Sequence, residues 1–367
     1  MPMIRLRNIT KKFGRVTAIN DLSLVVNDGE YVCILGPTGA GKTTLLKILA
    51  GILKPSEGEI YFDRLLMNDV PAEERNTALV FQSFALFPHM TVLDNVLFGP
   101  LSKGMKYEDA FKVAMDTLDL VRLGRRSRSY PNELSGGMQQ RVGLARSLAS
   151  GAKILLLDEP LGALDARLRT EIRDDIKNLA KDLHLTAIHV THDQEEAVTI
   201  ADRIALLKEG KIEQVGTPLD LYNHPATIFS AHFLGGANLL EGVIKKTSSK
   251  GSIIDLGEET EIRVSCGEFG TGKLVVVGIR LEKTRLFSEP VKENSLEGTV
   301  EGVTFLGSLR RYEVKLQAID TTVFCKISSS ALERFSAGDN VYVHFDPNDC
   351  VLFPSPRHGL YKEIEVI

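Results

Sequence analysis

Apolar runs alternate with helical patterns from the start of the chain to about residue 233. Three of these runs have the pattern of strands, YVCILG at 31–36, KILLLDE at 153–159 and TAIHVTH at 186–192, and a helical pattern follows each of them. Continuous apolar strands between helices are typical of a parallel sheet that is buried on both faces. The pattern therefore predicts an α/β domain.

The helical pattern after Asp165 is amphipathic, because its apolar residues recur at intervals of three and four positions. They form one predicted buried stripe: Leu168, Ile172, Ile176, Leu179 and Leu183. Residues 203–216 instead have the pattern of two short strands. The turn residues Glu209 and Gly210 between these strands predict a hairpin.

The pattern changes after residues 234–238, where short β-rich runs take the place of the helices. Glycine, aspartate and asparagine turns separate the runs, which is typical of a small barrel or sandwich. We therefore predict two domains. An α/β domain covers residues 1–236, and an all-β, barrel-like domain covers residues 237–367.

Composition and charge exclude several classes of protein. The 367 residues are 43% hydrophobic and 25% charged, as in globular proteins, and a net charge of −4 gives no reason to expect a nucleic-acid partner. No window is apolar enough to span a membrane, and the first ten residues lack the apolar core of a secretory signal. The scattered cysteines predict neither a zinc site nor a disulfide framework, and they fit a reducing cytoplasm. These cysteines are Cys33, Cys266, Cys325 and Cys350.

The stretch GPTGAGKTT satisfies the phosphate-loop pattern G-x-x-x-x-G-K-[ST], with a predicted strand before it and a predicted helix after it. Its glycines let backbone N–H groups close around phosphate oxygens. Lys42 can then reach the β- and γ-phosphates, and the hydroxyl of Thr43 can bind Mg²⁺. The nucleotide-binding residues predicted here are Gly36, Pro37, Thr38, Gly39, Ala40, Gly41, Lys42, Thr43 and Thr44.

Two carboxylates end the apolar run at 153–159. Asp158 is suited to holding Mg²⁺, either directly or through water, and the adjacent Glu159 can accept a proton from an attacking water. A strand that ends in two acids is usually a solvated turn. Beside a phosphate loop, it indicates hydrolysis of a nucleoside triphosphate.

A second glycine loop occurs far downstream, in the stretch LSGGMQQR at 134–141. A helical pattern follows it, and a helix start offers unpaired N–H groups and the positive end of the helix dipole. The loop is therefore a second predicted anion site, formed by Ser135, Gly136 and Gly137.

These motifs, with GALD at 162–165 and with Gln82 and His192, resemble in order and spacing the ATP-binding subunit of an ABC transporter. In that family two subunits pair head to tail, and each ATP lies between the phosphate loop of one subunit and the second glycine loop of the other. The resemblance implies a P-loop nucleotide-binding domain with a helical subdomain. It also implies a homodimer, ATP hydrolysis, and ATP and Mg²⁺ as ligands.

The resemblance further implies roles for single residues. Glu159, His192 and Gln82 are the implied catalytic residues, Phe13 stacks on adenine, and Asp165 joins the nucleotide site across the dimer. The implied metal ligands are Thr43, Gln82 and Asp158. The chain departs from the family's usual residues at Phe13, Gly162 and Met138, where Tyr, Ser and Gln are frequent.

The C-terminal domain resembles the transport-associated (TOBE-type) barrel of importer ATPases, through residues 275–287 and 297–316. Leu281 replaces a proline that is usual in that module. This resemblance implies a peripheral subunit on the cytoplasmic face of the cell membrane. Its partners would be transmembrane permease subunits and, indirectly, a solute-binding protein.

Two stretches, FLGGANLLEG and FLGSLRRYEV, are more similar to the polyamine and ferric-iron branch of importers than to the sugar branch. A sugar importer remains an alternative. A second alternative is a soluble ABC-type ATPase of translation or DNA repair. Such proteins carry two cassettes or a long coiled-coil insertion, and this sequence contains neither.

Overall fold

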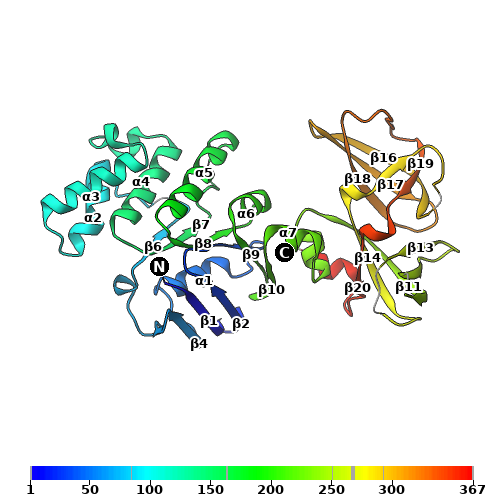
Figure 1. Cartoon of the computed structure of the whole chain (residues 1–367), viewed down its shortest axis with the longest axis horizontal. Coiled ribbons are helices and arrows are strands. Elements are labelled where there is room, and N and C mark those ends of the chain that lie inside the picture. Colours follow the sequence, from blue (N-terminus) through cyan, green and yellow to red (C-terminus); the bar gives the residue numbers. More distant parts are fainter. Residues whose placement is uncertain are drawn as a thin grey trace. The chain divides into compact units, whose positions relative to one another are not determined.

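The protein is described by a computed structural model that covers residues 2–83, 85–162, 164–249, 251–265, 269–291 and 293–365. The chain divides between Leu219 and Asp220 into two units, which are described separately below. Figure 1 shows the α/β elements of the first unit and the strands of the second. Cys266 lies outside the described residues.

The predicted parallel sheet forms the centre of the first unit. Its strand order is β10-β9-β3-β8-β7-β6, and every pair is parallel except the edge pair of β9 and β10. The strands are β3 (Tyr31–Leu35), β6 (Thr77–Val80), β7 (Ile154–Asp158), β8 (Thr186–Thr191), β9 (Arg203–Lys208) and β10 (Lys211–Gly216). Strands β3 and β8 are buried at every position, as the continuous apolar runs predict.

An antiparallel sheet of order β2-β1-β4-β5 completes the strands of this unit. It consists of β1 (Ile4–Phe13), β2 (Val16–Val26), β4 (Glu57–Phe62) and β5 (Leu65–Leu66). Helix α1 (Lys42–Leu49) shares one hydrophobic core with both sheets. That core fixes the helix that follows the phosphate loop.

Three helices have a core of their own and form the predicted helical subdomain (Figure 1). They are α2 (Val92–Ser102), α3 (Tyr107–Leu120) and α4 (Gly136–Ala149). Two more helices, α5 (Ala166–Asp182) and α6 (Gln194–Ile200), follow β7 and β8. Short 3-10 turns occur at Ala72–Glu74, Gly124–Arg126 and Pro131–Glu133.

Helix α5 confirms most of the predicted stripe and corrects one end of it. Ile172, Ile176 and Leu179 are buried, and Leu168 is half-buried. Leu183 is exposed, because the helix ends at Asp182 and Leu183 caps it outside the packed face.

The predicted hairpin is confirmed. Strands β9 and β10 pair with Lys208 opposite Lys211, and both turn residues have positive φ, 47° at Glu209 and 77° at Gly210. These angles are those of a type I′ turn, whose twist matches that of the paired strands.

The second unit contains two five-stranded antiparallel sheets around one hydrophobic core, which confirms the predicted all-β, barrel-like architecture. The first sheet has the order β13-β12-β11-β14-β20, and the second has the order β15-β19-β16-β17-β18. The strands are β11 (Ala237–Ser248), β12 (Gly251–Asp255), β13 (Glu261–Val264), β14 (Leu274–Arg280), β15 (Arg285–Phe287), β16 (Ser295–Phe305), β17 (Leu309–Leu316), β18 (Thr322–Ser328), β19 (Asn340–His344) and β20 (Cys350–Pro354).

Short helices accompany these sheets: α7 (Pro218–Asn223), α8 (Ile228–Phe233) and α9 (Leu360–Ile364), with 3-10 turns at Leu281–Lys283 and Pro347–Asp349. Helix α8 packs on the sheet through Ile228 and Ala231, which contact Val276 of β14 and Phe353 of β20. For this reason the structural division lies within the first turn of α7, between Leu219 and Asp220, and not at residue 236. The functional boundary at 236 stays a prediction.

Within the described residues, no helix has the length and apolar character needed to cross a membrane. Three cysteines, Cys33, Cys325 and Cys350, are buried free thiols.

The division between the units predicts how truncated chains behave. A chain ending at Leu219 should remain soluble and bind ATP about as well as the full chain, because the whole phosphate loop lies in the first unit. A chain ending at Leu234 keeps α8 but lacks β14 and β20, so Ile228 and Ala231 become exposed and the product should aggregate. Light scattering and calorimetric ATP titration measure both properties. The opposite order of solubility would assign α7 and α8 to the first unit.

Candidate functional site

The phosphate loop connects the end of β3 to the start of α1, in the predicted strand–loop–helix order. Gly41 lies directly before α1 with φ 100°, and a Cβ there would come within 2.3 Å of the Ala18 carbonyl oxygen. At Gly36 a Cβ would lie 2.2 Å from the Leu207 carbonyl oxygen. Both positions therefore need glycine, because the loop backbone passes directly against neighbouring strands.

The ammonium group of Lys42 is buried within this loop. Its Nζ donates hydrogen bonds of 2.8 Å to the carbonyl oxygens of Gly36 and Pro37. Burial lowers the pKa of Lys42, while the carboxylates of Glu159 and Asp158 oppose that shift. The lysine thus closes the loop and places a positive charge at its centre.

Asp158 ends β7 beside the start of α1. The hydroxyl of Thr43 donates a 2.9 Å hydrogen bond to Asp158 Oδ1. Burial raises the pKa of Asp158, and this hydrogen bond opposes the rise. These two predicted metal ligands are far apart in the sequence, and the fold brings them into contact.

Glu159 is the centre of the second half of the site. Its Oε1 lies 2.9 Å from His192 Nδ1, and its Oε2 accepts a long hydrogen bond of 3.4 Å from Gln82 Nε2. Its backbone has φ 45°, in the left-handed region that a residue with a side chain seldom adopts. The three residues predicted from the resemblance as catalytic therefore lie together.

A pocket of about 230 Å³ lies against the phosphate loop, with Glu159 in its lining. Glu159 and most of the predicted loop residues line it. The lining also includes Ala18, a residue of β2 that carries no sequence motif and was not predicted. The full lining is Ala18, Thr38, Gly39, Gly41, Lys42, Thr43, Thr44 and Glu159.

The second glycine loop has the predicted helix-start geometry but lies elsewhere. Ser135 caps α4, and its hydroxyl accepts from the Met138 N–H at 3.4 Å. Gly137 leaves no room for a side chain, because a Cβ there would lie 2.5 Å from Leu168 of α5. The loop therefore packs against the start of α5, where the Asp165 carboxylate accepts a hydrogen bond from the Leu168 N–H.

Several predicted binding residues are not among the described residues that line the phosphate-loop pocket. Some of them belong to the two halves just described: Gly36, Pro37, Ala40, Gln82, Asp158 and His192. The others lie in separate parts of the chain: Phe13, Ser135, Gly136, Gly137 and Asp165. Phe13 is 47% exposed at the end of β1. A single chain thus presents two separate groups of predicted nucleotide-binding residues.

A buried polar network lies behind the site and was not predicted. His189 is fully buried, with Nδ1 2.9 Å from the Tyr31 hydroxyl and Nε2 3.0 Å from Glu196. The Thr191 hydroxyl donates a 2.6 Å hydrogen bond to Glu196. The apolar pattern of β8 gives no signal for this network, because its partners come from β3 and α6. It holds the strand that ends beside His192.

Comparisons with known proteins agree with this geometry. Residues 19–162 match the family model of the ABC transporter, and residues 277–353 match that of the TOBE domain. The chain is 39% identical to a spermidine/putrescine import ATP-binding protein, PotA, of Rubrobacter xylanophilus, over 96% of this chain and 94% of that protein. It is 42% identical to an Fe(3+) ions import ATP-binding protein, FbpC, of Brucella abortus, over 86% and 88%.

Solved structures are similar to the first part of the chain. A dimeric bacterial ABC transporter cassette has a TM-score of 0.53 and 38% identity, and the match covers 59% of this chain and 98% of that one. A dimeric ATP-binding cassette in a post-hydrolysis state, bound to ADP and Pi, gives the same TM-score with 37% identity.

The separation of the two glycine loops predicts different defects. Lys42→Ala removes a buried charge from the pocket, and ATP affinity of the monomer should fall by about tenfold or more. Ser135 lies outside the pocket, so Ser135→Arg should leave the ATP affinity of the monomer near that of the wild type. Hydrolysis should be lost, because the second glycine loop is expected to contact the ATP of the other subunit. Calorimetry on the monomer measures the binding, and phosphate release measures the hydrolysis. Equal loss of affinity in the two variants would contradict this division.

Proposed function

Because this chain belongs to the ABC transporter family and carries a C-terminal TOBE domain, we propose that its ATP hydrolysis drives the import of a polyamine or of ferric iron. The chain is an ATP-hydrolysing subunit of the import type, and the relatives named above support the two cargo classes. One structural observation carries the catalytic part of the proposal. Glu159 lies between His192 and Gln82 at the edge of the phosphate-loop pocket.

The phosphate loop and Lys42 bind the triphosphate of ATP. Lys42 already lies at the centre of the loop, and its partners there are carbonyl oxygens, which carry no full charge. A phosphate oxygen is a stronger acceptor for an ammonium group than a carbonyl is. Bound ATP would therefore gain a charge-assisted hydrogen bond without a large rearrangement of the loop.

Thr43 and Asp158 fit a magnesium ion. Their hydroxyl and carboxylate oxygens lie 2.9 Å apart, and Mg²⁺ prefers oxygen ligands and few protein carboxylates. We assign Gln82 as a further ligand, because its amide lies beside Glu159 at the same edge. When bound, the ion would neutralise charge on the phosphate oxygens.

Glu159 accepts the proton of the attacking water. Its strained backbone and its contacts with His192 and Gln82 fix the direction of the carboxylate. A fixed carboxylate both orients the water and takes its proton, and such positioning lowers the barrier to phosphoryl transfer. His192 orients Glu159 and remains accessible to the γ-phosphate, because its side chain is 55% exposed.

The second group of predicted binding residues acts on the ATP of a partner subunit. Ser135, Gly136, Gly137 and Asp165 lie outside the pocket of their own chain, and two head-to-tail copies would bring them to each other's ATP. Phe13, exposed at the end of β1, would stack on adenine. This proposal makes the protein a homodimer with two shared ATP sites.

The remaining partners follow from the import function. We propose that the dimer binds transmembrane permease subunits on the cytoplasmic face of the cell membrane and works with a solute-binding protein. Residues 1–236 would be the ATPase domain, and residues 237–367 the transport-associated domain.

Glu159→Gln separates the chemistry from binding. The amide keeps the shape of the side chain but cannot accept the proton, so turnover should fall by about 10²-fold or more while Mg-ATP still binds. The variant should accumulate as an ATP-bound dimer. Size-exclusion chromatography with Mg-ATP and a phosphate-release assay measure the two effects.

Glu73→Gln is the matched control, because Glu73 is an exposed acid in a 3-10 turn away from the pocket. It should hydrolyse ATP at the wild-type rate. Wild-type hydrolysis by Glu159→Gln would remove Glu159 from the catalytic role and leave His192 or Gln82 as the next candidate.

The cargo is tested in cells. Deletion of the gene should reduce the uptake of labelled putrescine and spermidine, or that of labelled ferric iron, and leave sugar uptake unchanged. Restoration by the wild-type chain but not by Glu159→Gln ties the uptake to hydrolysis. A loss of sugar uptake alone would support the sugar alternative and overturn the proposed cargo.

A further inference from the structure

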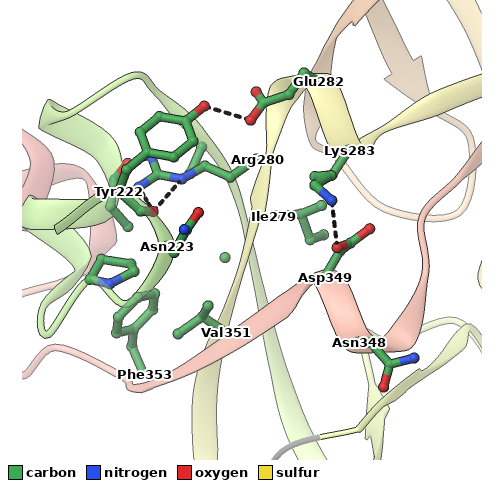
Figure 2. Close-up of a pocket in the computed structure, with 14 residues that line it drawn as sticks. Tyr222, Asn223, Ile279, Arg280, Glu282, Lys283, Asn348, Asp349, Val351 and Phe353 are labelled. Carbon is green, nitrogen blue, oxygen red and sulfur yellow. Dashed lines mark hydrogen bonds and ion pairs between the residues drawn. The ribbon is translucent and has the colours of Figure 1, made fainter. Parts of the chain in front are cut away.

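The second unit contains a cavity of about 220 Å³ that the import function does not use (Figure 2). Helix α7, the turn after it, β14, β20 and the two nearby 3-10 turns surround it. One part of the lining is apolar: Pro225, Ala231, Ala237, Gly278, Ile279, Val351 and Phe353. The other part is polar: Tyr222, Asn223, Arg280, Glu282, Lys283, Asn348 and Asp349.

Three of the polar residues already make contacts within the protein. The guanidinium of Arg280 donates to the carbonyl oxygens of Ala231, Leu234 and Gly236 at 2.6, 2.6 and 3.1 Å. It also lies 4.1 Å above the ring of Tyr222, whose hydroxyl donates to Glu282. Arg280 and Tyr222 therefore shape the wall of the cavity, whereas Glu282 keeps a second carboxylate oxygen that can accept a hydrogen bond.

Lys283 and Asp349 can still form hydrogen bonds and ion pairs with a ligand. They form a 3.0 Å ion pair, and their side chains are 50% and 29% exposed. Figure 2 shows the pair on one side of the view and Phe353 on the other, with Ile279 between them. Lys283 has further N–H donors and Asp349 a second carboxylate oxygen, so each can bind a ligand group of opposite charge.

The charges of the wall select the class of ligand. A dication such as a diamine would meet the positive charges of Lys283 and Arg280, and a dianion would meet those of Asp349 and Glu282. A zwitterion carries one charge of each sign, so its carboxylate can pair with Lys283 and its ammonium with Asp349.

Size and the apolar wall narrow the class further. A cavity of about 220 Å³ is below the usual range for drug-sized ligands, and it admits a molecule of amino-acid size. Ile279, Val351 and Phe353 would bury an apolar side chain. We propose that this cavity binds a free α-amino acid with an aliphatic side chain. The proposal does not depend on the identity of the imported cargo.

Matched ligands test the proposal on the full-length protein by calorimetry. L-leucine should bind about tenfold or more tightly than 3-methylbutan-1-amine, which lacks the carboxylate, or 4-methylpentanoate, which lacks the ammonium. Glycine should also bind more weakly than leucine, because it has no side chain to bury. Putrescine, a dication, should bind most weakly.

Protein variants test the pairing of charges. In Lys283→Met, leucine should lose its advantage over 3-methylbutan-1-amine, because nothing is left to recognise the carboxylate. In Asp349→Asn, it should instead lose most of its advantage over 4-methylpentanoate. Lys273→Met, an exposed lysine that does not line the cavity, is the control and should bind leucine like the wild type. Thermal unfolding checks that each variant is folded.

Several outcomes would overturn the proposal: no leucine binding at millimolar concentration, tighter binding of putrescine than of leucine, or unchanged ligand preference in a folded Lys283→Met. If a variant fails to fold, the calorimetric ligand series on the wild-type protein still tests whether the cavity binds an amino acid.

Discussion

The site depends on the burial of three neighbouring parallel strands, β3, β8 and β7. Strand β8 lies between β3 and β7, with Leu35 opposite Thr191 and Asp158 opposite Val190. Because parallel strands point the same way, their carboxyl ends lie along one edge of the sheet, where open α/β sheets bind ligands. The phosphate loop, the two acids and His192 each follow one of these ends. Contact between them is therefore a consequence of strand register.

Burial also sets the electrostatics of this edge. It disfavours the charged forms of both Lys42 and Asp158, which lowers the pKa of the lysine and raises that of the carboxyl. Carbonyl oxygens hold the ammonium, and a hydroxyl holds the carboxylate. The protein thus keeps two opposite charges partly desolvated and close together, which strengthens their interaction with a charged ligand.

The sequence predicts most of this arrangement because its signals are local. A continuous apolar run indicates a buried strand, and a glycine pattern indicates a phosphate loop, without knowledge of distant residues. Local patterns do not predict contacts between elements that are distant in the sequence. In the sequence, the apolar residues of α8 continue the pattern of the first domain, but in the structure they pack on β14 and β20. His189 has the pattern of an ordinary strand residue, and only the fold reveals Tyr31 and Glu196 around it.

At Glu159, the requirement of folding stability conflicts with that of the proposed catalysis, because the backbone is left-handed there. Holding a non-glycine residue in this region costs about 1 kcal/mol or more, and glycine would release that strain. Glycine has no carboxylate, however, so the substitution that relaxes the backbone also removes the proposed base. Selection for heat resistance alone would therefore favour the loss of the proposed base at this position. The carboxylate is kept although its own backbone conformation favours glycine.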